Sequence, residues 1–568
     1  MAAAREQQGQ VPDPAFLSVM KLGDRRISLY HKQTAEKEGG PVLTKQTFLH
    51  GTLILVGAGF VTKVLGFVYR IALSRLIGDE GMGLFQMAFP ILIFIITITT
   101  GGIPVAISKL VSEAEAKRDE QRIRSILIVS ILVVICASLF FTLLTLVGAP
   151  LIARTLLTDE RAIYPLMGIA PIVPIIAVSS IFRGYFQGRQ HMSPYAISQI
   201  VETITRIFTV IMIARLLLPY GVEYAAAGAM IGMVIGEFAG MLFLLRSYKN
   251  DPKRPPLRFK PRELFQWKQW GRFRETIMRL MRLAVPVTAS RTVGSLSYAV
   301  EPIIVSQSLA IAGISVAAST ALYGQLEGMA IPLLYFPAFI TYALSVSLVP
   351  AISEAAAKGK HRMVAHRLNQ AMRLALVVGG PCAIIMFVLA VPLTDLLYHN
   401  TSVARLLQIM APFAVFLYLQ GPLSAVLQGL DKAKDAMRNS IFGAVVKTAL
   451  IFLLGSQPFL GIDGVVIALN CGLVIVTVFH FLSVMRYTPF PLMAGDLLKL
   501  ALAVGAMGFV AHLVFIHAAG QMWMRILLSL TTSVAVYLIA LVVLSLLKQD
   551  DVRRIPYIGH WLAAFLPR

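Results

Sequence analysis

The sequence predicts an all-α polytopic membrane protein, and three observations support this fold class. Of the 568 residues, 57% are hydrophobic and only 14% are charged, whereas soluble domains carry about 25% charged residues. The mean hydropathy is +0.74. The apolar residues form continuous runs of about 20 residues, the length of a membrane-spanning helix, and they do not alternate with polar residues as transmembrane strands require.

About fourteen such runs follow one another along the chain. Their approximate centres are Phe60, Ile95, Val134, Val173, Thr209, Val234, Gly294, Phe336, Met386, Val415, Val446, Ile475, Gly505 and Val536. Each run reads as one spanning helix, because only helices and closed barrels satisfy every backbone polar group inside a membrane.

The segments between the runs alternate in charge. Those rich in Lys and Arg are 108–124, 183–194, 246–278, 353–373 and 429–438. Those nearly free of them are 79–81, 216–224, 310–319, 455–462 and 517–522. Basic loops favour the cytoplasmic side, so this alternation predicts a cell-membrane protein with both termini in the cytoplasm. It also accounts for the net charge of +22 without nucleic acid as a partner.

The two halves of the chain are related by a shift of 241 residues. The shift maps Ser112-Glu113-Ala114 onto Ser353-Glu354-Ala355, Ala170-Pro171 onto Ala411-Pro412, Gln187-Gly188 onto Gln428-Gly429, and Arg206 onto Lys447. The offset shrinks at the first span of each half. Six helices per repeat keep both repeats in one orientation, which predicts two parallel lobes with a substrate site between them.

Six domains follow from this organisation. They are a disordered cytoplasmic N-terminal extension (1–46), an N-terminal six-helix lobe (47–245), a basic cytoplasmic linker (246–278), a C-terminal six-helix lobe (279–486), helices 13 and 14 (487–548) and a cytoplasmic interfacial tail (549–568). Three cysteines, Cys136, Cys382 and Cys471, lie in separate apolar runs. Their spacing predicts neither disulfides nor a metal site, and no Gly-rich phosphate loop is present. We therefore expect no cofactor, no metal and no enzymatic activity.

Three stretches carry a family resemblance. They are KVLGFVYRIALSRLIG from Lys63, GDEGMGLFQMAFPILIFIITITTGGIPVAISKLVSEA from Gly78, and ALYGQLEGMAIPLLYFP from Ala321. With the arrangement of six, six and two helices, they resemble the multidrug/oligosaccharidyl-lipid/polysaccharide exporter superfamily, and within it the polysaccharide transporter or stage V sporulation protein B-like group, related to lipid II flippases. The resemblance implies alternating access and a polyprenyl-pyrophosphate-linked saccharide as cargo, with a role in spore-cortex peptidoglycan synthesis.

Ionisable residues inside spans are costly and often mark a transport site. The candidate substrate-binding residues are Arg70, Arg75, Arg206, Arg291, Glu327 and Lys447, and the candidate ion-coupling residues are Glu237 and Glu301. Cationic side chains suit a pyrophosphate, since Arg offers paired donors and Lys a point charge. We expect a monomer in contact with membrane lipids.

Structural roles remain open for these residues. Arg75 can snorkel to the membrane interface, Arg206 can pair with Glu202, and Glu327 can hydrogen-bond between helices. Lys63 and Glu202 are weaker candidates with helix pairing as the alternative. The acidic residues also suit a different class of protein, a cation-coupled drug or metabolite exporter of the same superfamily.

Overall fold

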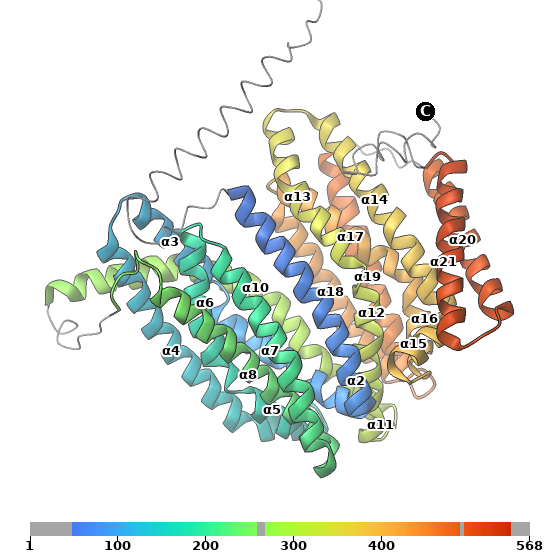
Figure 1. Ribbon diagram of the computed structural model, residues 1–568, viewed down its shortest axis with the longest axis horizontal. Coiled ribbons are helices and arrows are strands. Elements are labelled where there is room, and N and C mark those ends of the chain that lie inside the picture. Colours follow the sequence, from blue (N-terminus) through green and yellow to red (C-terminus); the bar gives the residue numbers. More distant parts are fainter. Residues whose placement is uncertain (1–47, 258–266, 489–493, 547–568) are drawn as a thin grey trace, which may run out of the picture. The chain divides into compact units, whose positions relative to one another are not determined.

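The computed structural model describes residues 48–257, 267–488 and 494–546, and within these ranges the chain is helical and contains no strand (Figure 1). The residues from Gly51 onward form one compact unit. The predicted N-terminal extension 1–46 and interfacial tail 549–568 lie outside the described residues, as does the middle of the predicted linker.

The helices of the described chain provide fourteen candidate membrane-crossing segments. Eleven segments are long and apolar enough to cross a membrane. One of them, Gly57–Ala116, holds two crossings, because its helix is broken at Gly78, where φ is 71° and the backbone is left-handed. Two further helices, α7 and α10, have 25 and 45 residues. Both carry ionisable side chains along their length.

The first lobe is built from seven α-helices and three short helical turns. They are α2 (Phe48–Thr100), α3 (Ile103–Ala116), α4 (Glu120–Leu151), η1 (Ile152–Leu156), η2 (Glu160–Ala162), α5 (Ile163–Ile169), α6 (Ile172–Gly188), α7 (Ser193–Leu217), η3 (Leu218–Tyr220) and α8 (Val222–Lys249). Capping side chains fix where some of these helices start. The side chain of Asp119 accepts from the backbone N–H of Arg122 at the start of α4, which satisfies a donor that the helix itself leaves free.

The second lobe begins with the long helix α10 (Trp267–Ile311). It continues through α11 (Val316–Tyr323), η4 (Gly324–Ala330), α12 (Ile331–Tyr335), α13 (Ala338–Ala357), α14 (His361–Val388), α15 (Ala390–Tyr398), α16 (Val403–Met410), η5 (Ala411–Phe413), α17 (Ala414–Gly429), α18 (Ala433–Gly455) and α19 (Ile462–Tyr487). The last pair, α20 (Ala494–His517) and α21 (Met522–Val543), packs beside α14 at the edge of this lobe (Figure 1).

The parallel repeat is visible in the backbone. Helices α3, α4, α6, α7 and α8 correspond in order to α13, α14, α17, α18 and α19, and α6 packs on α3, α4 and α8 as α17 packs on α13, α14 and α19. Three residue pairs separated by 241 positions share a left-handed backbone conformation: Arg118 and Gly359, Thr158 and His399, Gln190 and Asp431. The predicted fold class of two parallel six-helix lobes plus two C-terminal helices is therefore confirmed.

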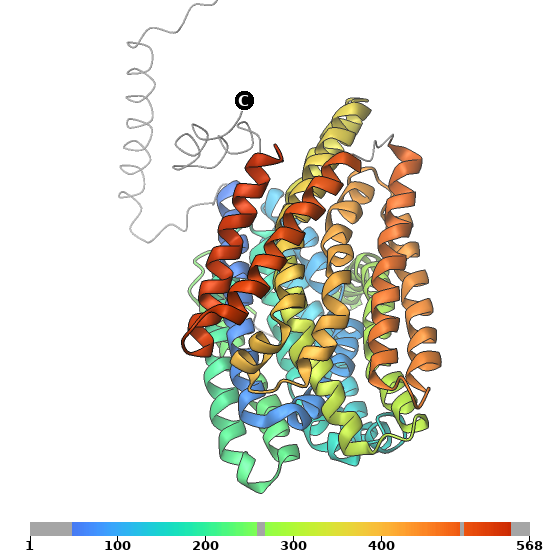
Figure 2. The same ribbon diagram turned by 90° about the vertical axis from the view of Figure 1, so that its right-hand side faces the viewer.

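The turns gather at two opposite ends of the helices. We call the end with the turns 117–119, 189–192, 358–360 and 430–432 the basic end, and the end with the turns 78–80, 218–221, 312–315, 399–402 and 456–461 the neutral end. Helix α10 connects the lobes, since it packs on α3 and α4 of the first lobe and on α18 of the second. Figure 2 shows the helices from the side, with the turns at top and bottom.

Candidate functional site

A cluster of two arginines and two glutamates, of which Glu237 is buried and the others are partly buried, lies inside the first lobe. Arg183 Nη2 on α6 is 2.8 Å from Glu237 Oε1 on α8 and 3.1 Å from Glu202 Oε2 on α7. Arg206 Nη1 lies one helical turn from Glu202 and contacts its other oxygen at 3.0 Å. The Arg183 guanidinium also lies over the ring of Tyr195 at 5.8 Å. The four charges compensate one another, which offsets the large cost of desolvating each of them.

A second charged cluster lies in the second lobe and faces the first. Lys447 Nζ on α18 is 2.5 Å from Glu301 Oε2 on α10. Glu327, on the π-helix η4, is buried beside Glu301 and also lies within electrostatic range of Lys447 and of Arg70 on α2. Its backbone oxygen accepts from Gln86 Nε2 of α2 at 3.1 Å. Short π-helical turns are rare in proteins and are frequent at functional sites.

Arg70 on α2 is one of the basic side chains that the described part of the chain leaves without an acidic partner. It makes no ion pair within 4.0 Å among the residues that the structure describes. Tyr298 of α10 and Tyr398 of α15 lie within its electrostatic range. Tyr398 is fixed by a 3.1 Å hydrogen bond to the oxygen of Met329. An anion entering between the lobes would therefore meet a guanidinium that makes no ion pair with any residue in the described ranges.

Arg291 joins α10 to the first lobe. Its Nη1 donates to the oxygen of Gly101 at 2.7 Å, and the N–H of Gly102 donates to Thr288 Oγ1 of α10 at 2.9 Å. A Cβ on Gly102 would lie 2.1 Å from the oxygen of Ala284. The absence of a side chain at Gly102 thus permits the close approach of α10. Lys63, one of the two weaker sequence candidates, is exposed on α2.

The two lobes meet closely at the neutral end, and the contact is reciprocal. A Cβ on Gly83 would lie 1.9 Å from the oxygen of Thr320, and a Cβ on Gly324 would lie 1.9 Å from the oxygen of Asp79. Residues 79 and 320 are 241 positions apart, as are residues 83 and 324. The same backbone-to-glycine contact therefore occurs twice, once in each direction. We call this contact region the seal.

Side-chain hydrogen bonds follow the same symmetry in the seal. Thr320 Oγ1 donates to Asp159 Oδ2 at 2.7 Å, and Asn400 Nδ2 donates to Asp79 Oδ2 at 3.3 Å. Asp159 and Asn400 are again 241 positions apart. Gln325 Nε2 adds a 2.7 Å bond to Asp79 Oδ2. Asp79 is thus held by two donors from the opposite lobe.

Two long polar side chains extend the seal to the helix ends. Arg75 Nε donates to the oxygen of Leu397 at 2.7 Å, and its Nη2 to the oxygen of Leu396. Gln307 Nε2 of α10 donates to the oxygens of the equivalent residues of the first lobe, Leu156 at 3.2 Å and Thr155 at 2.8 Å. Arg75 and Gln307 are 232 positions apart, so the offset is shorter here, as the sequence predicts for the first span of each half.

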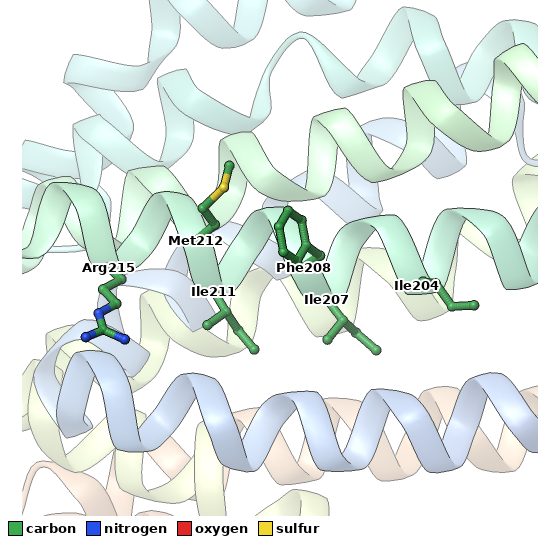
Figure 3. Close-up of a pocket in the computed structure, with 6 residues that line it drawn as sticks. All are labelled: Ile204, Ile207, Phe208, Ile211, Met212 and Arg215. Atoms are coloured by element: carbon green, nitrogen blue, oxygen red, sulfur yellow. The ribbon is translucent and has the colours of Figure 1, made fainter.

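An apolar pocket of about 540 Å³ lies along one face of α7 (Figure 3). Its lining residues are Ile204, Ile207, Phe208, Ile211, Met212 and Arg215. In Figure 3 the side chains of Ile207 and Ile211 point toward the neighbouring helix α2. The pocket lies on a different face of α7 from Glu202 and Arg206, and it holds one charge, Arg215. It is therefore distinct from the charged clusters.

The structure gathers most of the predicted site residues into these groups. Arg206 and Glu237 lie in the first-lobe cluster. Glu301, Glu327 and Lys447 lie in the second, and Arg70 of α2 is within electrostatic range of Glu327. Arg75 lies in the seal and Arg291 at the junction of α10 with the first lobe. Among the described residues, no group of His, Cys, Asp or Glu could hold a metal ion.

Sequence reasoning misses Arg183 and, apart from Arg75, the residues of the seal. The charge pattern places Arg183 in a basic loop, 183–194, whereas α6 continues to Gly188 and carries Arg183 inside the lobe. The continuation of the apolar pattern through Ile181, Phe182, Tyr185 and Phe186 is the available signal. The seal joins residues that are distant in sequence, and only the repeat offset connects them.

Comparisons with known proteins agree with this architecture. The family model described as "Polysaccharide biosynthesis protein" matches residues 48–356, and the MatE model matches residues 326–453. The chain is 45% identical to "Stage V sporulation protein B" of Bacillus subtilis (strain 168) over 520 residues, which covers 91% of this chain and 99% of that protein. It is 25% identical to "Lipid II flippase MurJ" of the same organism over 540 residues, covering 89% and 97% of the two chains.

Two solved structures share the fold. "Lipid II flippase MurJ, inward closed conformation" superposes with a TM-score of 0.66 at 17% identity, covering 86% of this chain and 98% of that one. An inward-facing multidrug resistance MATE family transporter of the MOP superfamily superposes with a TM-score of 0.63 at 16% identity, covering 75% and 94%. The family model spans more than half of the sequence, and the protein is accordingly a member of the polysaccharide biosynthesis protein family of polytopic membrane proteins.

Proposed function

We propose that the protein is a flippase that moves a polyprenyl-pyrophosphate-linked saccharide, a lipid II-like cell-wall or polysaccharide precursor, across the cell membrane by alternating access. The observation that carries the proposal is an internal charged site between two lobes, next to a seal that closes one end. A site that is closed on one side is what a carrier needs in order to avoid a continuous pore. The relative named for sporulation supports a role in that process, within which spore-cortex peptidoglycan synthesis is the step that we propose.

The residues divide between cargo binding and conformational control. Arg70 and Arg291 are proposed to bind the pyrophosphate. Arg70 forms no ion pair among the described residues, and Arg291 donates to Gly101 through only one of its nitrogens there. Lys447 and Glu327 complete the wall of the site, and Arg206 supports it from the first lobe. Arg75, whose donors are held by the oxygens at the end of α15, is released when the seal opens. Cargo contact is its second proposed role.

Glu301 and Glu237 are proposed to couple transport to a cation gradient. Each is buried and paired with one basic residue, Glu301 with Lys447 and Glu237 with Arg183. A cation or proton that binds the carboxylate competes with the basic partner, which frees that partner for an anionic cargo. This exchange would link the gradient to cargo binding.

A cation-coupled drug or metabolite exporter is the alternative function. The MatE match over residues 326–453 and the buried carboxylates favour it. Arg70, which has no acidic partner in the part of the chain that the structure describes, weighs against a cationic drug, since like charges repel strongly in a site of low dielectric constant. We propose that the protein works as a monomer in the cell membrane with both termini in the cytoplasm, so that the basic end faces the cytoplasm.

A flipping assay with purified protein in liposomes tests the proposal. The probe is a fluorescent polyprenyl-pyrophosphate-linked disaccharide, and its exposure on the opposite leaflet is measured over time. The expected result is flipping that an unlabelled polyprenyl-pyrophosphate disaccharide inhibits, while a polyprenyl lipid without pyrophosphate inhibits poorly. Transport of a cationic dye without any flipping of the lipid-linked disaccharide would instead establish the exporter.

A further inference from the structure

Arg161 joins two segments of the first lobe at the neutral end. It lies in the short turn η2, and its Nε and Nη2 are 3.1 and 2.9 Å from the two carboxylate oxygens of Asp159. Its Nη1 is 2.6 Å from Glu80 Oε1 on α2. The guanidinium therefore holds together two carboxylates that come from separate parts of the chain.

Both of these segments carry acceptors of the seal. Asp159 is only 2% exposed, and it accepts from Thr320 across the lobes at 2.7 Å. Asp79, which accepts from two side chains of the second lobe, directly precedes Glu80, and its Oδ1 accepts from the Glu80 N–H at 3.0 Å. Arg161 is thus bonded to one acceptor of the seal and to the chain neighbour of the other.

The closed seal keeps the Asp159 carboxylate away from water. Removing an ionised carboxylate from water is costly unless a cation and hydrogen bonds compensate the charge. The second-lobe side chains that donate to the two aspartates of the seal, Thr320, Gln325 and Asn400, are uncharged. The ion pair with Arg161, at 2.9 Å, therefore supplies the positive charge from within the first lobe. Opening of the neutral end would let water take over part of this compensation.

The second lobe forms the same turn without an ion pair. The shift of 241 residues maps Asp159 onto Asn400 and Arg161 onto Ser402. Asn400 Oδ1 accepts from the Ser402 N–H at 3.0 Å, as Asp159 Oδ1 accepts from the Arg161 N–H at 3.0 Å. The backbone cap is therefore common to both lobes and needs no guanidinium. The charged contacts of Arg161 add something other than the local turn.

We propose that Arg161 is a positioning residue for closure of the neutral end. It neutralises Asp159 and holds the first-lobe acceptors where the second-lobe donors meet them, so it stabilises the closed seal relative to the open one. The inference rests on alternating access in the proposed function, and it adds the residue that sets the balance between the two states. Arg161 acts on the cargo site only through the seal.

Distances across the neutral end test the inference. Spin labels at Tyr220→Cys and Phe459→Cys, exposed on the first and second lobes, are measured in the full chain without its native cysteines. Arg161→Gln should raise the ratio of open to closed molecules by about three- to tenfold, because the closed state then buries Asp159 without its counter-charge. Arg161→Lys should give an intermediate ratio, since an ammonium lacks the planar fork that contacts both carboxylates.

A double variant shows whether the charge itself is responsible. Asp159→Asn/Arg161→Ser copies the pair that the second lobe carries, so the backbone cap remains and the buried charge is gone. We expect its ratio of open to closed molecules to return close to that of the wild type. A double variant as open as Arg161→Gln would overturn the inference, because compensation of Asp159 would then not be what closes the seal.

Two controls use the same pair of labels. Arg154→Gln removes an ion pair with Glu160 at the same end, whose side chains are 61% and 71% exposed, and it should leave the distances unchanged. Gly83→Ala, which places a Cβ 1.9 Å from the oxygen of Thr320, should lengthen them.

The controls separate failure of the inference from failure of the proposed function. Longer distances in Gly83→Ala together with wild-type distances in Arg161→Gln would overturn the role of Arg161 alone. Opening in Arg154→Gln as large as in Arg161→Gln would also overturn it, since any lost charge would then suffice. Wild-type distances in every variant would mean that the seal does not open, which would refute alternating access itself.

Discussion

Arg70 and Arg75 lie on one helix, five residues apart, and the sequence assigns them the same chemistry. The structure separates them, because Arg75 reaches the carbonyl oxygens at the end of α15 while Arg70 remains without an ion pair within 4.0 Å in the described part of the chain. The sequence identifies an ionisable residue inside a span, because the residue can be seen within an apolar run. It does not identify the partner, because the partner lies more than 300 residues away.

Arg70→Ala is expected to reduce flipping of a polyprenyl-pyrophosphate-linked disaccharide by at least about tenfold, since a charged hydrogen bond to the headgroup is lost. Arg70→Lys should restore only part of the rate, because Lys lacks the paired donors. The measurement is the initial rate in liposomes that contain equal amounts of protein. Arg215→Ala, an exposed arginine on α7, is the control and should transport like the wild type. Full activity of Arg70→Ala would exclude Arg70 from the site.

The ion pairs of Arg183 lead to a prediction about the stability of the protein. Its removal leaves Glu237 without its partner in the interior and Glu202 with Arg206 alone. Breaking a buried ion pair from one side costs about 3–5 kcal/mol, so Arg183→Met should lower the apparent unfolding temperature in detergent markedly. The double variant Arg183→Met/Glu237→Gln should recover part of the loss, because the unpaired carboxylate is gone. Equal unfolding temperatures for the single variant and the wild type would contradict the structural role.

At the scale of elements, most of the helices are predictable and their junctions are not. Hydropathy locates a span, and the 241-residue offset is enough to pair the segment of α3 with that of α13 and the segment of α6 with that of α17. The π-helix η4 has no such signal, since its sequence GQLEGMA resembles any small-residue helix segment. Its widened turn places Glu327 toward the site and Gly324 toward the seal. The packing of η4 against neighbouring helices determines both positions, and the local sequence does not.

Substitution of a seal glycine should shift the conformational equilibrium. The Cβ of Gly83→Ala would lie 1.9 Å from the oxygen of Thr320, a separation that backbone atoms cannot tolerate, so the closed seal becomes strained. We expect a larger fraction of molecules open at the neutral end. Spin labels on Tyr220→Cys and Phe459→Cys, exposed at the neutral end of each lobe, should report longer distances in a background without the native cysteines.

Two comparisons make the glycine experiment decisive. Gly324→Ala, the equivalent change in the opposite lobe, should lengthen the distances in the same way. Gly505→Ala on α20, where a Cβ would meet nothing within 4 Å, should leave the distribution unchanged. Identical distributions in the Gly83 and Gly324 variants and in the wild type would mean that the seal is not a moving contact.

For the whole molecule, the alternation of basic and neutral loops predicts orientation as well as the number of crossings. Reporter fusions within 246–278 and at the C-terminus should both give a cytoplasmic signal, because basic loops resist translocation. A fusion within the neutral turn 456–461 should give the opposite signal and serves as the control. An external signal from either of the first two fusions would reverse the proposed orientation of the basic end.

The seal has the form of a homodimer interface contained within one chain. In a twofold dimer each contact appears twice, once in each direction across the axis. Had the two halves stayed identical, Asp79 and Asp159 would each face an aspartate across the axis. The second half carries Thr320 and Asn400 instead, so each carboxylate meets a donor. The difference between the halves thus gives two hydrogen bonds where identical halves would place two repulsive carboxylate pairs, and each bond has its single negative charge on the first half.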